Sequence, residues 1–195
     1  MFLRTLLSLI TLLLAATPPY DALKSQAEKF FEEKSFSRAH EVYEQASALQ
    51  LPADERRWVE FRLADTSWRG APEDQDVRRK AQQALEELIR RSAENHDRVW
   101  AEANESLGEL TGAVGYSLSA LDWWAGSADL PLARRRYLAI VWRMMDAGME
   151  YRIPREIFVN AAEIAESPKD RARAQFLLAT RLLREGRPDS AERAL

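Results

Sequence analysis

Apolar residues recur every three or four positions along most of the chain, which is the spacing of amphipathic helices. The pattern begins with Leu23, Ala27 and Phe30, and similar stripes continue to the end of the sequence. No segment rich in Val, Ile and Thr alternates between apolar and polar residues. Four later stripes each follow a proline, whose fixed φ favours the first turn of a helix, at Pro131, Pro154, Pro168 and Pro188. The pattern predicts an all-α fold with no sheet.

Small or slim residues recur twelve positions apart, a spacing that lets the two helices of a hairpin cross closely. Four pairs follow this rule: Ala27 with Ala39, Gly108 with Ala120, Met145 with Ile157, and Ala179 with Ala191. A fifth pair, Ala64 and Ala81, lies seventeen apart and spans the longest predicted connection. Short helices cannot bury their apolar stripes alone, so they must pair and the pairs must stack. We therefore expect about five antiparallel hairpins in one solenoid.

The first hairpin carries the residue order of a known repeat, with Leu23, Ala27, Phe30, Ala39, Tyr43, Ala46 and Pro52. The third and fifth hairpins match in part, through Gly108, Ala120 and Trp124 and through Ala179 and Ala191, whereas the second and fourth are degenerate. In these positions residues 20–195 resemble the tetratricopeptide repeat (TPR) family. The resemblance implies a right-handed solenoid of helical hairpins. Helical hairpins of another class remain the alternative.

The first sixteen residues have the composition of a secretory signal. Arg4 is their only charge, Leu6 to Leu14 is almost wholly aliphatic, and Thr17-Pro18-Pro19 ends the apolar run. A membrane-spanning helix needs about 20 apolar residues, so this run is too short for one. We expect a signal peptide over 1–16, a repeat domain over 17–195, and export to the periplasm or cell envelope. A retained anchor and an amphipathic first helix are the alternatives.

The last predicted hairpin is short, because its second helix starts near Pro188 and the sequence ends at Leu195. A solenoid needs a polar cap on its last repeat. We therefore expect the repeat domain to be truncated at its C-terminal end and to belong to a longer protein. A frayed C-terminus is the alternative.

The composition offers little for catalysis. The sequence has no cysteine, two histidines and seven scattered glycines. His40 and His96 lack the partners of a zinc helix or a catalytic triad. The net charge is −3, and the arginine runs are interleaved with acidic residues. We predict no catalytic residue, no metal site, no cofactor, no nucleic-acid partner and no stable membrane span.

The resemblance implies that the first helix of each hairpin lines a concave groove for an extended peptide or another domain. The candidate groove residues are acidic in the middle and more basic at the end: Lys24, Glu28, Phe31, Glu102, Glu105, Glu109, Arg173, Phe176 and Thr180. Trp123 and Trp124 are adjacent on one helix, so both rings cannot face the same core. Trp124 matches the buried aromatic of the repeat. Trp123 is expected to face a neighbouring repeat, a partner or solvent.

These features favour an exported, non-catalytic scaffold that mediates protein–protein or interdomain binding. One alternative is the N-terminal module of a larger envelope protein, such as an α-2-macroglobulin-like protease inhibitor, which the stretch 55–69 suggests. A lytic transglycosylase is a further alternative, because its helical superhelix precedes a catalytic domain. A soluble adaptor for outer-membrane assembly or secretion is the third.

Overall fold

The structure, a computed structural model, describes residues 19–92, 94, 96–127 and 130–195, so the predicted signal over 1–16 lies outside it. The described residues form ten α-helices and one short 3₁₀ helix, η1, and no strand. Their bounds are α1 Tyr20–Glu32, α2 Phe36–Ser47, α3 Ala53–Gly70, α4 Gln75–Arg91, α5 Arg98–Thr111, α6 Val114–Ala125, α7 Leu130–Asp146, η1 Glu150–Arg152, α8 Arg155–Ile164, α9 Pro168–Arg184 and α10 Pro188–Glu192.

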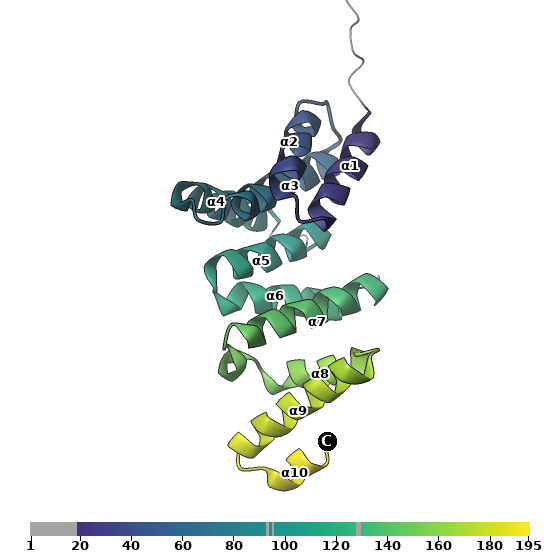
Figure 1. Cartoon of the computed structure of the whole chain (residues 1–195), viewed down its shortest axis with the longest axis vertical. Coiled ribbons are helices and arrows are strands. Elements are labelled where there is room, and N and C mark those ends of the chain that lie inside the picture. The colour runs from purple at the N-terminus through teal and green to yellow at the C-terminus, as the bar shows by residue number, and fades with distance from the viewer. Residues whose placement is uncertain (1–18, 93, 95, 128–129) are drawn as a thin grey trace, which may run out of the picture.

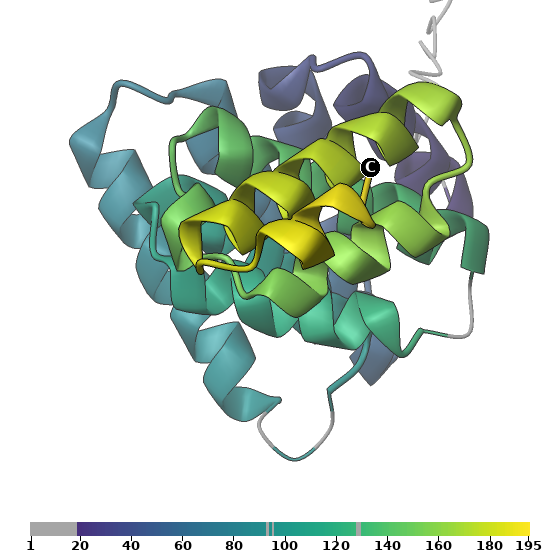
Figure 2. The same cartoon turned by 90° about the horizontal axis from the view of Figure 1, so that it is seen from below.

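The helices form five successive hairpins that stack along the long axis of the molecule (Figure 1). Each helix packs against the helix before it and the helix after it. Seen along the stack, α9 and α10 lie across its C-terminal end (Figure 2). The predicted all-α solenoid of about five hairpins is therefore confirmed.

The helices begin and end where the local sequence satisfies their free backbone groups. The Asp74 carboxylate accepts from the amides of Asp76 and Val77 at the start of α4. The Ser167 hydroxyl accepts from the amide of Asp170 at the start of α9. Gly186 ends that helix with a φ of 71°, a conformation that glycine adopts without steric cost.

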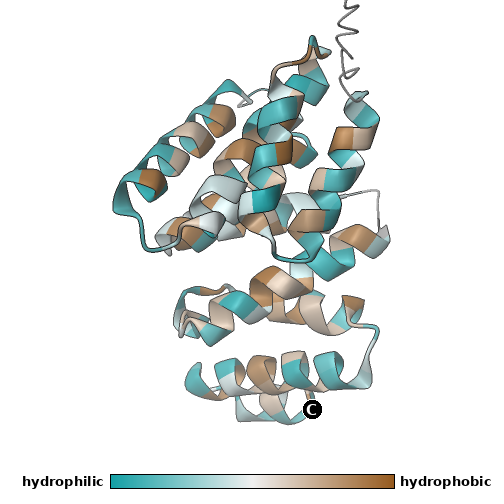
Figure 3. Cartoon of the chain, turned by 45° about the horizontal axis from the view of Figure 1, so that its top comes forward, coloured by the Kyte–Doolittle hydropathy of each residue, from teal (hydrophilic) through white to brown (hydrophobic). Residues whose placement is uncertain are grey.

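The core is a series of apolar clusters that neighbouring hairpins share. One cluster joins α1, α2 and α3, the next joins α3, α4 and α5, and the largest extends from α5 to α9. Figure 3 shows hydrophobic and hydrophilic positions on different sides of the helices. Each hairpin thus buries its apolar stripe only because another hairpin lies next to it.

Most of the predicted crossing residues lie in this core. The Ala27/Ala39, Ala64/Ala81, Gly108/Ala120 and Ala179/Ala191 pairs are buried. The prediction for the fourth pair is wrong, because Met145 and Ile157 are only half-buried, whereas Met144 and Phe158 are buried. Two large side chains fill the interior of that hairpin, so no close crossing of small residues forms there.

The second hairpin corrects a further expectation. The wider spacing of Ala64 and Ala81 predicts a long connection, but only residues 71–74 separate its helices. The helices themselves are longer, since α3 has 18 residues and α4 has 17, against 13 and 12 in the first hairpin.

Candidate functional site

The candidate groove residues lie on the first helices of the first, third and fifth hairpins. Lys24, Glu28 and Phe31 are on α1, and the carboxylates at 102, 105 and 109 are on α5. Arg173, Phe176 and Thr180 are on α9. The structure does not bring the three groups into one cluster, because the first helices α3 and α7 lie between them in the stack (Figure 1).

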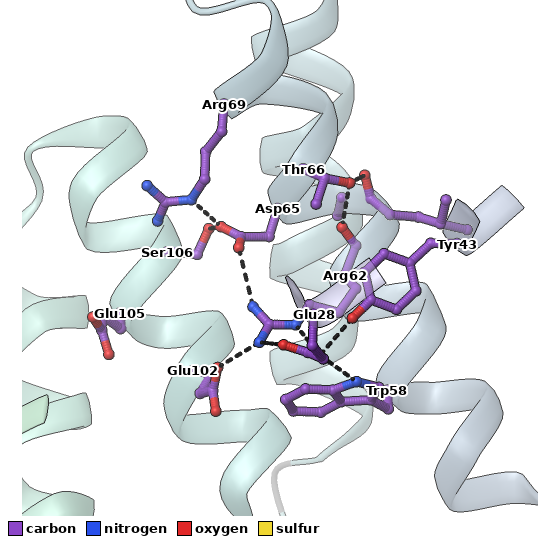
Figure 4. Close-up of polar contacts among 12 residues, drawn as sticks. Glu28, Tyr43, Trp58, Arg62, Asp65, Thr66, Arg69, Glu102, Glu105 and Ser106 are labelled. Carbon is purple, nitrogen blue, oxygen red and sulfur yellow. Dashed lines mark hydrogen bonds and ion pairs between the residues drawn. The ribbon is translucent and has the colours of Figure 1, made fainter. Parts of the chain in front are cut away.

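Glu28 binds an arginine that sequence reasoning did not single out. Arg62 of α3 is 3% exposed and donates from Nε to Glu28 Oε1 at 3.0 Å and from Nη2 to Oε2 at 2.7 Å. The same carboxylate accepts from the Tyr43 hydroxyl and from Trp58 Nε1 (Figure 4). This paired, hydrogen-bonded carboxylate joins the first hairpin to the second.

The three α5 carboxylates bind arginines from the helices on both sides. Glu102 contacts Arg136 of α7 at 3.0 Å and Arg98 of its own helix at 2.7 Å, and its Oε2 lies 3.8 Å from Arg62 Nη2. Glu105 contacts Arg143 at 3.1 Å and Arg136 at 3.4 Å.

Glu109 is the third of these α5 carboxylates. It accepts from both Nη atoms of Arg69 of α3, at 2.8 and 2.9 Å, and from Nη1 of Arg143 of α7 at 2.6 Å. We call this row the arginine–carboxylate ladder: Arg62 and Arg69 on α3, Glu102, Glu105 and Glu109 on α5, and Arg136 and Arg143 on α7.

Helical geometry explains the alignment of the ladder. Residues separated by seven lie two turns apart on the same face of a helix. Arg62 and Arg69 have this separation, as do Glu102 and Glu109, and so do Arg136 and Arg143. When the three helices lie next to one another, each arginine therefore lies near a carboxylate of α5.

A buried carboxylate of α3 extends the contact between α3 and α5. Asp65 accepts from Arg69 Nε at 2.8 Å and from the Ser106 hydroxyl at 2.6 Å. Ser106 in turn accepts from Trp68 Nε1 at 3.0 Å. Figure 4 shows Asp65 between Arg62 and Arg69 and next to Ser106. These hydrogen bonds satisfy polar groups that would otherwise be costly to bury.

The electrostatic environment differs along the ladder. Burial raises the pKa of Glu105, although Arg136 and Arg143 oppose that shift. Burial would also raise the pKa of Glu109, but the hydrogen bonds from Arg69 and the charge of Arg143 bring it below its ordinary value. Burial by itself would lower the pKa of Arg62, but Glu102 and Glu28 hold it above the usual range.

These contacts change the expected character of the middle of the groove. Glu102 is 2% exposed and Glu105 is also buried, so neither forms an acidic surface. Their charges, and that of Glu109, are neutralised by arginines of the same chain. In this structure the three carboxylates join hairpins, and a role for them in binding a partner stays a prediction.

Lys24 and Phe31 lie at the N-terminal end of this network. Lys24 Nζ donates to Glu55 Oε2 at 2.9 Å and lies 5.7 Å from the centre of the Trp58 ring. Phe31 is half-buried, with the Arg62 guanidinium 4.1 Å from its ring centre. Both side chains project from α1, lie next to this network and stay partly accessible to solvent.

The α9 candidates are the most open. Phe176 is 62% exposed and borders a pocket of about 190 Å³ that Thr180 also lines. Arg173 is exposed, binds Asp146 at 2.8 Å and lies 4.5 Å from the centre of the Trp142 ring. These three residues are available to a partner without breaking the ladder.

Trp123, the candidate exposed aromatic, is half-buried. Its Nε1 donates to the carbonyl of His96 at 2.8 Å, and its ring meets Trp124 edge to face at 4.8 Å. Trp124 is buried, as the repeat pattern predicts. Contacts with its own helix and with the connection before α5 thus occupy part of the Trp123 surface, and a role for this ring in binding a partner stays a prediction.

The two histidines also have local contacts. His40 Nδ1 lies 3.0 Å from the Thr66 hydroxyl, and the His96 ring stacks on Trp100 at 3.8 Å. In the described part of the chain, no group of three or more His, Asp or Glu side chains is arranged to hold a metal ion. Among those same residues, no helix is long and apolar enough to cross a membrane.

Comparison with known proteins identifies the fold. No family model and no curated protein matches the sequence. The structure is similar to a crystal structure of the nearly identical TPR-like repeats of a putative kinesin light chain from Podosopora anserina, with a TM-score of 0.53 and 15% identity over 89% of this chain and 90% of that one. A point variant of those repeats gives a TM-score of 0.52 at 16% identity, with the same coverage. The TPR-like fold expected from the sequence is thus confirmed.

Proposed function

We propose that this chain is a non-catalytic scaffold that binds a protein or peptide through the first helices of its hairpins. The observation that carries the proposal is the TPR-like stack itself, whose likeness to solved repeats covers 89% of the chain. Repeat stacks of this kind create extended binding surfaces. The proposed surface uses the accessible ends of the candidate set, namely Lys24 and Phe31 on α1 and Arg173 and Phe176 on α9.

The chemistry of these ends supports a protein partner. Phe176 offers a large apolar surface beside a pocket, and aromatic and arginine side chains are enriched at protein interfaces. Between these ends, the ladder joins the first helices α3, α5 and α7 to one another. A partner therefore meets a preformed surface, which lowers the entropic cost of binding.

A photocrosslinker tests this role directly. Phe176 is replaced by p-benzoylphenylalanine in the full chain, expressed in the source organism and irradiated in intact cells. The control carries the same group at Glu41, an exposed position on α2. We expect a discrete protein adduct from position 176 that position 41 does not give. Identical adducts from both positions, or none from position 176, would contradict a binding role for α9.

Export to the periplasm or cell envelope is part of the proposal. It is supported by the sequence of residues 1–16, with cleavage expected after Ala16. N-terminal sequencing of the protein from an envelope fraction is expected to begin at Thr17. A protein that keeps Met1 and stays with the cytoplasmic fraction would contradict export.

The alternative is an interdomain module within a larger envelope protein. The stretch 55–69, which suggested an α-2-macroglobulin-like protein, forms most of α3 and supplies Arg62 and Arg69 to the ladder. Its charged residues thus have a role in hairpin stacking. The mass of the denatured protein from source cells separates the two cases, because a larger protein has a mass far above 22.4 kDa.

A further inference from the structure

A second surface lies between α6 and α8, the second helices of the third and fourth hairpins. Two pockets of about 290 and 280 Å³ adjoin there and share Ala125, Tyr137 and Asn160. Tyr137 belongs to α7, which packs against both α6 and α8. By helical spacing, Tyr137 also lies on a different side of α7 from Arg136 and Arg143. We call this surface the α6–α8 groove, and the ladder does not use it.

The α6–α8 groove has room for bulky apolar groups. Trp124 lines one pocket, Leu118 and Leu121 line the other, and Tyr137 lines both. An apolar cavity of about 150 Å³ holds a benzene molecule. Each pocket therefore accommodates a side chain such as Leu or Phe.

The charges along the groove are unbalanced. Its lining carries three carboxylates, Asp122, Glu156 and Glu163, and one guanidinium, Arg134. Arg134 is paired with Glu166 at 2.8 Å and Glu156 is paired with Arg155 at 3.1 Å, and both partners lie outside the lining. Asp122 and Glu163 are exposed and form no ion pair within the described residues. The groove thus attracts cations and repels polyanions such as nucleic acids and acidic membrane surfaces.

One buried donor also lacks a partner at this place. Trp124 is 2% exposed, and its Nε1 has no hydrogen-bond acceptor in the part of the chain that the structure describes. A buried unsatisfied donor is costly to stability. A small shift that brings an acceptor of a bound segment to this N–H would recover that cost.

We propose that the α6–α8 groove binds a peptide segment of a partner protein in which bulky apolar residues are flanked by Lys or Arg. The apolar side chains occupy the two pockets. The flanking cations pair with Asp122 and Glu163. A carbonyl of the segment accepts from Trp124 Nε1. This surface is separate from the α1 and α9 ends, so its test can succeed or fail independently of the crosslinking at Phe176.

Two hexapeptides of opposite charge test the proposal. Fluorescein-labelled Lys-Lys-Leu-Phe-Lys-Lys and Glu-Glu-Leu-Phe-Glu-Glu, both with amidated C-termini, are titrated with the full chain by fluorescence anisotropy at low salt. We expect the lysine peptide to bind at least tenfold more tightly than the glutamate peptide. The double variant Asp122→Arg/Glu163→Arg is expected to lose at least tenfold of that affinity.

Charge reversal at Glu41 is the matched control, because that residue is exposed on α2 and lies outside the lining of the groove. Glu41→Arg is expected to leave the affinity within about twofold of the parent. In ¹⁵N spectra, the indole N–H of Trp124, assigned with Trp124→Phe, is expected to shift on binding. The proposal is overturned if the lysine peptide does not bind, if both peptides bind equally, if Glu41→Arg weakens binding as much as the double variant, or if the Trp124 resonance does not move.

Discussion

Arg62 is the most deeply buried charge among the arginines of the ladder. Its guanidinium meets carboxylates from two other helices, Glu28 of α1 and Glu102 of α5. Desolvating an ion is costly, and the ion pairs and hydrogen bonds offset that cost only while every partner is present. A single arginine thus makes the first three hairpins depend on one another.

Arg62→Ala is expected to lower the free energy of unfolding by about 3–5 kcal/mol, because it leaves the Glu28 carboxylate without its ion-pair partner and removes one of the cations beside the buried Glu102. Urea unfolding followed by circular dichroism measures the change. The control is Arg90→Ala, which removes a 74% exposed partner of Glu87 and is expected to cost less than about 1 kcal/mol. Equal losses in the two variants would mean that burial of the Arg62 pair contributes nothing to stability.

The two adjacent tryptophans allow the stability cost of losing a buried ring to be compared with that of losing a half-buried one. Trp124→Ala is expected to cost about 3–5 kcal/mol, the range for truncating a large buried aromatic. Trp123→Ala is expected to cost less, because that ring is only half-buried. Thermal unfolding of both variants makes the comparison. A similar loss in both would show that Trp123 is as much a core residue as Trp124.

Two carboxylates of the ladder are expected to respond to pH in opposite directions. Burial raises the pKa of Glu105, so its contribution to stability is greatest at low pH and is lost as pH rises through its folded pKa. The pKa of Glu109 is lowered despite its burial, through hydrogen bonds and ion pairs with Arg69 and Arg143. Its contribution is therefore present above the unfolded pKa and is lost as pH falls through the folded pKa.

Unfolding free energies of Glu105→Gln and Glu109→Gln between about pH 3 and pH 8 measure these contributions. The stability of the parent relative to Glu105→Gln is expected to fall as pH rises. Its stability relative to Glu109→Gln is expected to increase over the same change. Slopes of the same sign for both variants would refute this assignment.

At the scale of elements, close crossing in the third hairpin depends on Gly108. A Cβ atom there would lie 2.4 Å from the Ser117 hydroxyl and 3.1 Å from the Ser117 backbone nitrogen. The backbone atom cannot rotate away, so the helices would have to separate. Glycine at this point therefore sets the distance between α5 and α6.

Gly108→Ala is expected to destabilise the protein by about 1–3 kcal/mol, the usual cost of overpacking. Gly115→Ala is the comparison, since a Cβ at that position of α6 meets nothing within 4 Å. There the higher helix propensity of alanine is expected to leave stability unchanged or raise it by up to about 1 kcal/mol. Thermal melts test the pair, and a Gly108→Ala variant as stable as the parent would contradict the close crossing.

The ladder also influences how the first helices α3, α5 and α7 align with one another. Neighbouring first helices carry charges at the same seven-residue spacing, so a shift of one helix along another would separate several pairs at once. Apolar contacts are less demanding, because the hydrophobic effect is non-directional. The charges therefore favour one register of α3, α5 and α7.

Across the whole molecule, the arrangement of helices could be predicted from local sequence. The three-to-four spacing of apolar residues and the prolines located most helices. The twelve-residue spacing of small residues identified the first, third and fifth hairpins. These signals act within about 20 residues, where helix geometry relates sequence to structure directly.

The pairing of charges could not be predicted in this way. Glu109 and Arg69 are separated by 40 residues, and their contact depends on how two hairpins stack. The resemblance to TPR repeats implied groove positions for Glu102 and Glu105, but it gave no means of identifying Arg62, Arg136 or Arg143 as their partners. A seven-residue spacing of opposite charges on successive first helices is the signal that would have revealed them.

The proposed role of this stack of hairpins in holding another protein is tested by two masses of one sample. The protein is isolated from source cells without denaturant, and its native mass is compared with its mass after denaturation. We expect a native mass well above the denatured mass, because a partner stays bound. Equal masses, with the protein as a single free chain, would contradict the scaffold role.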